Sequence, residues 1–151
     1  MITLKKASKE DTEHFISLGK EMHREGAFSF LPFNENRVRR GALHYIREES
    51  ACAFLVFRDT ECIGMHVGSL THYFFSDALL ASGLVTYVRP EFRGGRAAVL
   101  LVKEFIDWGK EKKAAEVYIG VSLGVNLEKS HKFFKHFGFN YVGGNYKLRL
   151  M

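Results

Sequence analysis

The sequence predicts one domain, residues 1–151, with an α/β fold of the α+β type, in which a mixed sheet of six or seven strands carries helices on both faces. Two observations support this prediction. Segments with the apolar patterns of strands and helices follow one another in the order β-α-α-β-β-β-α-β-α-β. Helices connect successive strands only in the second half of the chain, so a mixed sheet is expected instead of an all-parallel one.

The first segments of the chain predict a strand and two capped helices. Residues 2–7 alternate weakly, as a strand does, and Ser8 can cap the helix that follows. Asn34 can cap a second, shorter helix. The segment 26–33 between them is unusually apolar, so it either covers the core or lines a substrate cleft. The side chains expected on the buried helix faces are Phe15, Leu18, Gly19 and Met22, then Val38, Ala42, Tyr45 and Ile46.

Residues 51–57 and 62–73 predict an antiparallel hairpin, because both are apolar and a polar turn separates them. Both cysteines of the chain lie in this hairpin. If the strands pair directly across the turn, Cys52 falls opposite Val67 and not opposite Cys62. A disulfide between the two cysteines would then have poor geometry.

The second half of the chain alternates strands with helices. Residues 78–88 predict a strand, residues 95–113 a helix and residues 116–121 a buried strand. A short helix then ends at Gly138, and residues 139–150 predict a final strand or hairpin. Four side chains of that short helix share a face: Ser130, Phe133, Phe134 and Phe137.

The net charge of +5 and the pI near 9.2 favour a polyanionic partner, which charge alone leaves open as nucleic acid, a membrane surface or a phosphorylated cofactor. Nucleic acid is not expected, because the basic residues are spread over several elements without interleaved aromatic side chains. No apolar segment approaches the ~20 residues of a membrane span, so a cytoplasmic protein without membrane contact is expected. No metal is expected, because the candidate ligands lack ligand spacing: Cys52, Cys62, His66 and His72.

The most informative stretch is a basic glycine loop between the strand at 78–88 and the helix that follows it. Pro90 stops the strand, and Arg93 and Arg96 bring positive charge. Gly94 and Gly95 allow a tight turn that aims successive N–H groups at one point, and the helix adds its positive end. These features predict a binding site for phosphate.

Residues 87–98, Tyr-Val-Arg-Pro-Glu-Phe-Arg-Gly-Gly-Arg-Ala-Ala, resemble the acetyl-CoA motif of the GNAT family of N-acetyltransferases. That motif is Arg/Gln-x-x-Gly-x-Gly/Ala after a strand that ends in aromatic-Val-x-Pro-Glu. Residues 130–139 are similar to the family's second landmark, small-x-x-Phe-Tyr-x-x-x-Gly-Phe. The resemblance implies a mostly antiparallel sheet that splays between its fourth and fifth strands. It also implies transfer of the acetyl group of acetyl-CoA to a primary amine of a small molecule, peptide or protein, with a homodimer as one possible assembly.

The resemblance also implies roles for individual residues at the cofactor. The backbone N–H groups from Gly94 to Ala98 would hold the pyrophosphate of acetyl-CoA, and the strand end would pair with its pantetheine arm. Phe134 would pack against the cofactor at a position where the family often has a tyrosine that protonates the leaving thiolate. The cofactor-binding residues implied in this way are Tyr87, Val88, Arg93, Gly94, Gly95, Arg96, Ala97, Ala98, Asn126 and Phe134.

The catalytic residues and the acceptor site are predicted with less support from motifs. Ser122 is the first candidate for the missing proton donor, ahead of His131 and a water molecule, and His72 is the first candidate for the base. Other candidate bases are His23, Glu25 and Asp77. The acceptor wall implied by the resemblance consists of Phe28, Phe30, Leu31 and Phe33. Because the tyrosine is absent, an acyl-CoA-binding regulatory module with little transferase activity is the alternative.

Overall fold

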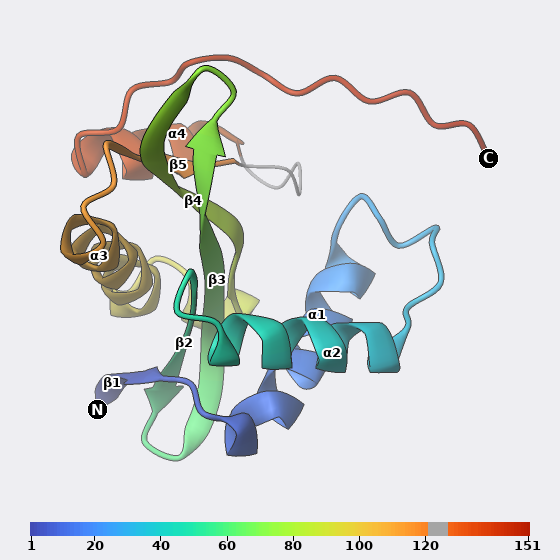
Figure 1. Ribbon diagram of the computed structural model, residues 1–151. Helices are drawn as coiled ribbons and strands as arrows, with labels where there is room; N and C mark the ends of the chain where they lie inside the picture. Colours follow the sequence, from blue (N-terminus) through green and yellow to red (C-terminus); the bar gives the residue numbers. More distant parts are fainter. Residues whose placement is uncertain (121–126) are drawn as a thin grey trace.

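The structure is a computed structural model that describes residues 1–120 and 127–151. Its centre is a five-stranded sheet in the order β1-β2-β3-β4-β5, with helices on both sides (Figure 1). The first four strands pair antiparallel and β5 pairs parallel to β4. The predicted fold class is thus confirmed. The strands are β1 (Ile2–Lys6), β2 (Ala51–Arg58), β3 (Glu61–Tyr73), β4 (Ser76–Val88) and β5 (Glu116–Ile119).

Two helices cover one face of the sheet, and their ends follow the predicted caps. A 3-10 turn, η1 (Lys9–Asp11), precedes α1 (Thr12–Glu25), and the Ser8 N–H donates to Asp11 Oδ2 at 2.8 Å. The Asn34 side chain accepts a hydrogen bond from the Arg37 N–H at the start of α2 (Glu35–Arg47). The core on this face includes Phe15, Leu18, Ala42, Leu55, Met65 and Tyr87.

The opposite face is covered by α3 (Arg96–Glu111), whose apolar side packs deeply on the sheet. Phe105 is fully buried there, and two strand glycines allow the helix to come close. A Cβ on Gly68 would lie 2.6 Å from Phe105 Cε1, and a Cβ on Gly83 would lie 3.2 Å from Phe105 Cε2. The position of α3 relative to β3 and β4 is therefore fixed by direct contact of a ring with the backbone. The buried side chains that form this core together with Phe105 include Phe54, Val56, Ile63, Ala81 and Leu101.

The two cysteines lie on opposite faces of the sheet and are both free. A bulge places Ile63 between the pairs Val56–Gly64 and Phe57–Cys62, so Cys52 faces Gly68. The predicted pairing with Val67 was thus wrong by one residue, because the extra residue shifts the register. Burial raises the pKa of Cys52 to about 12 and that of Cys62 to about 11, so both thiols stay protonated near neutral pH.

The last part of the chain departs from the predicted fold. The helix α4 (Leu127–His136) is followed by Gly138, whose φ of +92° ends it as expected. Residues 139–151, however, make no ladder and run as an extended segment toward the loop between α1 and α2 (Figure 1). The described residues therefore form five strands and not six or seven, because an alternating segment becomes a strand only when a sheet edge pairs with it. No helix in the described ranges is both long and apolar enough to cross a bilayer.

Candidate functional site

Among residues 1–120 and 127–151, no strand pairs with one side of β4 over the second part of the strand. β4 pairs with β5 only from Leu80 to Gly83, while its pairing with β3 continues to Val88. The strand also carries one extra residue, Leu84, between the pairs Val67–Val85 and Gly68–Gly83. Leu84 therefore has no ladder partner in β3, and it directly follows Gly83, the last residue of β4 that pairs with β5. The backbone from Leu84 to Val88 thus forms an edge that no strand of the described residues covers, and such an edge can pair with a ligand.

The direction of the backbone groups on this edge follows from the pairing with β3. The Arg89 N–H donates to the Ile63 carbonyl at 2.9 Å, so Arg89 faces β3. Because antiparallel neighbours alternate, the N–H and C=O groups of Val88 and Thr86 point toward the open edge and those of Tyr87 point toward β3. Of the two strand residues predicted to contact the cofactor, Val88 thus directs its N–H toward this edge, whereas the backbone groups of Tyr87 pair with β3. The Val88 carbonyl already accepts a hydrogen bond of 2.8 Å from Arg93 Nε.

The loop from β4 to α3 ends in a cradle of backbone donors. A short 3-10 turn, η2 (Pro90–Phe92), leads to Gly94, whose φ of +83° requires the freedom of glycine. Gly95 then caps α3 without a side chain, so no side chain covers the N–H groups that open the helix. These donors and the positive end of the helix favour an anion at this point.

A hollow of about 400 Å³ lies at this end of α3, and its charged lining is mostly positive. Arg58, Arg93 and Arg96 contribute cations against the single carboxylate of Glu91. Arg58 was missed by the sequence reasoning, because it is the last residue of β2 and only the strand order brings it here. Its guanidinium carbon lies 5.5 Å from the centroid of the Phe92 ring. Arg58 and Arg96 are both exposed to solvent and thus to an anion.

Arg93 is bound within the protein, although the sequence predicted it as a phosphate partner. Its two terminal nitrogens donate to the two carboxylate oxygens of Glu25 at the end of α1, one of them at 2.7 Å. The Tyr87 hydroxyl donates to the same carboxylate at 2.9 Å, and the guanidinium lies 5.3 Å from the Tyr87 ring centroid. These three residues tie the glycine loop to α1 and compensate the charge of Arg93.

The environment of this cluster sets the protonation of its members. The Arg93 guanidinium, helped by the Tyr87 hydroxyl, holds the pKa of Glu25 below its ordinary value. Burial and the neighbouring Glu25 carboxylate raise the pKa of Tyr87 to about 12. Glu25 is thus a stable anion and Tyr87 a stable phenol near neutral pH. Neither group is poised to exchange a proton with an acceptor amine.

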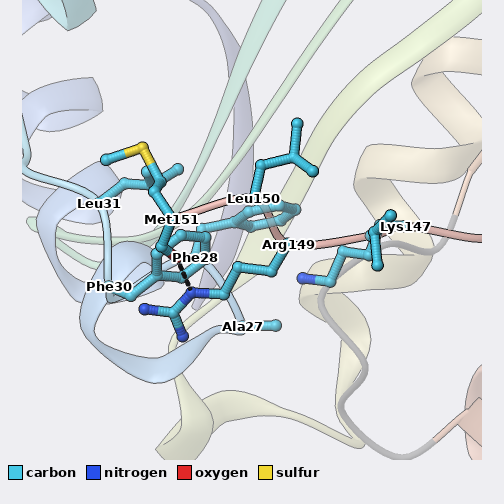
Figure 2. A pocket seen from close by; sticks show the side chains of 9 residues that line it. Ala27, Phe28, Phe30, Leu31, Lys147, Arg149, Leu150 and Met151 are labelled. Atoms are coloured by element: carbon cyan, nitrogen blue, oxygen red, sulfur yellow. Dashed lines mark hydrogen bonds between the residues drawn. The ribbon is translucent and has the colours of Figure 1, made fainter.

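The loop between α1 and α2 forms a second hollow, of about 530 Å³, together with the end of the described chain (Figure 2). Lys147 Nζ lies 4.5 Å from the centroid of the Phe28 ring. Arg149 Cζ lies 3.8 Å from the centroid of the Phe30 ring. Of the predicted wall residues, Phe28, Phe30 and Leu31 line this hollow. Phe33 packs instead against His23, with their ring centroids 5.5 Å apart.

The contact between residues 147–151 and the loop is weak. Two cation–π contacts at exposed positions contribute about 1–2 kcal/mol together. Fixing the backbone of each residue costs about 1 kcal/mol or more. The free energy needed to order five residues therefore exceeds the contribution of these two contacts, so the two contacts alone hold the segment weakly.

The remaining predicted residues are not gathered at the open edge. His72 lies exposed at the tip of the β3–β4 hairpin, opposite Leu79 and roughly 17 Å along β4 from Leu84. Its role as a base stays a prediction that this placement does not support. His23 Nε2 is hydrogen-bonded to the Leu31 carbonyl at 2.6 Å. Phe134 is half-buried on α4 beside Phe133 and Phe139.

Two predicted residues, Ser122 and Asn126, lie outside the described residues. Within residues 1–120 and 127–151, no three histidine, cysteine, aspartate or glutamate side chains come together as a metal site.

The fold and the site define a class of α/β protein in which a split sheet presents a strand edge beside an anion-binding helix start. The model of the acetyltransferase (GNAT) family matches residues 15–139, which is most of the chain. The protein therefore belongs to the GNAT acetyltransferase family. A search of the curated proteins finds no relative of this sequence.

Solved structures show the same fold at low sequence identity. The aminoglycoside acetyltransferase AAC(6')-Iy, solved with a bisubstrate analogue, is 18% identical with a TM-score of 0.79, covering 100% of this chain and 99% of its own. A transcriptional regulator from Bacillus halodurans is 17% identical with a TM-score of 0.76, and the match covers 99% of this chain and 100% of that one. A predicted acetyltransferase from Clostridium acetobutylicum, solved with acetyl-CoA, is 13% identical with a TM-score of 0.77, and the match covers 99% of this chain and 96% of that one.

Proposed function

We propose that this protein is an N-acetyltransferase that takes the acetyl group from acetyl-CoA and transfers it to a primary amine. The observation that supports this most directly is the open edge of β4, which leads into the basic glycine loop at the start of α3. A strand edge suits the amide groups of a pantetheine arm, and the loop suits its pyrophosphate. Membership of the GNAT family and the structures solved with CoA ligands support the same assignment.

The residues present fit the phosphates of acetyl-CoA. The uncapped N–H groups from Gly95 into α3 would hold the pyrophosphate, and Arg96 and Arg58 would neutralise it. Arg93 would act indirectly, because its contacts to Glu25 and the Val88 carbonyl hold the loop in shape. Val88 and Thr86 would pair with the pantetheine arm through their backbone.

Acetyl-CoA supplies a thioester that reacts with a neutral amine. The amine nitrogen bonds to the acetyl carbon, the carbon–sulfur bond breaks, and the proton lost by the amine is matched by the proton gained by the CoA sulfur. On the protein side, N–H groups of the open β4 edge, such as that of Val88, would polarise the thioester carbonyl. Positioning of the two substrates along this edge would supply much of the remaining rate enhancement.

The test is a calorimetric titration with CoA and acetyl-CoA, followed by a thiol-release assay over a panel of primary amines. Binding with amine-dependent release of the CoA thiol is expected. Binding without transfer to any amine would support the alternative, an acyl-CoA-binding regulatory module. If neither ligand binds, both assignments are wrong.

Gly94→Pro is expected to weaken CoA binding by tenfold or more. Proline fixes φ near −65°, whereas Gly94 has a φ of +83°, so the loop must change shape. The calorimetric Kd measures the effect. Gly41→Ala in α2 is the control, because a Cβ there would meet nothing within 4 Å. An unchanged Kd in a folded Gly94→Pro variant would contradict the loop assignment.

Phe134→Tyr is expected to leave kcat unchanged or to raise it, because the added hydroxyl restores a proton donor beside the leaving sulfur. Phe133→Tyr is the matched control, since it adds the same hydroxyl to the preceding half-buried ring of α4, whose centroid lies 5.3 Å from that of Phe134. Steady-state thiol release measures both variants. A large loss of kcat in Phe134→Tyr alone would argue against the placement of α4 beside the thiol.

A further inference from the structure

The loop between α1 and α2 holds two positively charged groups on two aromatic rings. Lys147 lies over Phe28 and Arg149 lies over Phe30, and the two rings are 37% and 39% exposed (Figure 2). Because these rings are reachable from solvent and the segment over them is weakly held, other cations can take the same places. Lys147 and Arg149 therefore occupy positions on the rings that positive groups of a ligand could take.

The positions of Lys147 and Arg149 indicate the charge pattern of such a ligand. Lys147 and Arg149 are two residues apart on an extended segment, so their side chains leave the backbone about 7 Å apart on the same side. Among the described residues that line this hollow, none is acidic. Lys147 is thus held by a ring face, and Arg149 is held by a ring face and by a hydrogen bond of 2.6 Å from its Nε to the Met151 carbonyl oxygen.

We propose that Phe28 and Phe30 form a two-point cation site for the acceptor, and that Lys147 and Arg149 occupy it until the acceptor binds. The acceptor would be an amine that carries two positive groups in addition to the reacting nitrogen, and the backbone spacing of about 7 Å between Lys147 and Arg149 gives the first separation to test. This inference rests on the proposed function, since it assigns the loop to the acceptor of that reaction.

The test measures binding directly, by calorimetry on the full chain without CoA. A linear five-carbon diamine is compared with the matching five-carbon monoamine. The diamine is expected to bind at least fivefold more tightly, which exceeds the twofold statistical advantage of two equivalent ends. The double variant Lys147→Gln/Arg149→Gln removes the internal competitor and is expected to tighten diamine binding several-fold.

Loss of the rings should remove the preference. Phe28→Leu/Phe30→Leu is expected to bind the two amines within twofold of each other, because leucine keeps apolar volume but offers no ring face. Phe74→Leu is the matched control, since Phe74 is a fully exposed ring at the β3–β4 hairpin tip, and it should keep the preference. Equal binding of the two amines by the unaltered protein would overturn the inference, as would a preference that survives loss of both rings.

The blocked tripeptide Lys-Leu-Arg, which copies residues 147–149, separates two sources of the same charge pattern. Tighter binding of the tripeptide than of the diamine would support a basic peptide as acceptor, and the reverse would support a small polyamine. The proposed function fails separately, in the CoA titration. If CoA binds and amines are acetylated but the diamine shows no preference, only the two-point cation site is wrong.

Discussion

Phe105→Ala is expected to lower the free energy of unfolding by about 3–5 kcal/mol, the range for removing a buried aromatic ring. Phe105 is fully buried at the contact between α3 and the sheet, where it meets Gly68, Gly83 and His66. None of these neighbours can fill the space, because two are glycines and the third is held by a hydrogen bond to Thr86. The residual cavity should therefore stay close to the volume of the ring.

Urea denaturation followed by circular dichroism measures this effect. The control is Val99→Ala on the same helix, since Val99 is 39% exposed and its loss should cost well under 1 kcal/mol. A loss below about 1.5 kcal/mol for Phe105→Ala would mean that α3 shifts to close the cavity. The contact of the ring with the strand glycines would then not fix the helix.

A fall in stability of about 2 kcal/mol between pH 8 and pH 5 is expected from His66 alone. His66 is fully buried between Phe54 and Phe105, and burial lowers its pKa to about 3. Its Nδ1 shares a hydrogen bond of 2.8 Å with the Thr86 hydroxyl, and its Nε2 has no partner within the described residues. A second proton on the ring would thus be buried without an acceptor.

The direction of this change in stability follows from the pKa values of His66 in the folded and the unfolded protein. The unfolded histidine binds a proton near pH 6.5 and the folded one only near pH 3, so the contribution is complete above pH 6.5 and is lost as the pH falls. Four carboxylates also have a lowered pKa: Glu10, Asp11, Glu25 and Glu35. Their contributions are lost mainly below about pH 5, so they add little to the change between pH 8 and pH 5.

The measurement is the free energy of unfolding of the unaltered protein and of His66→Gln at pH 8, 6.5 and 5. The variant is expected to lose the slope between pH 6.5 and pH 5, because glutamine does not titrate. His44→Gln on the exposed side of α2 is the control and should keep the slope. Equal slopes in the unaltered protein and in His66→Gln would show that the buried histidine is not responsible.

The features that were predictable from the sequence are those encoded within a few residues. The caps at Ser8 and Asn34, the end of α4 at Gly138 and the glycine loop before α3 all follow from local geometry. The helix faces follow from spacing alone, and the buried side chains Phe15, Leu18 and Phe105 lie where the period places them. The family motif placed the anion cradle because it is continuous in the chain.

The features that were missed depend on residues far apart in the sequence or on one extra residue in a strand. Glu25 and Arg93 are 68 positions apart, and no local signal indicates that the arginine is already paired. Arg58 reaches the cradle only through the order of the strands. The bulge at Ile63 moved Cys52 by one register position, although the hairpin itself was predicted. Residues 139–151 alternate like a strand, but their path depends on which surface accepts them.

Residues 127–151 contain no buried side chain, unlike every helix that packs on the sheet. Their free energy of local opening is therefore small compared with that of the sheet and its two buried faces. A denaturation curve will report the unfolding of the core and will be insensitive to α4 and the segment after it. Substitutions that change how residues 147–151 contact the loop between α1 and α2 should therefore leave the folding of the sheet and its packed helices unchanged.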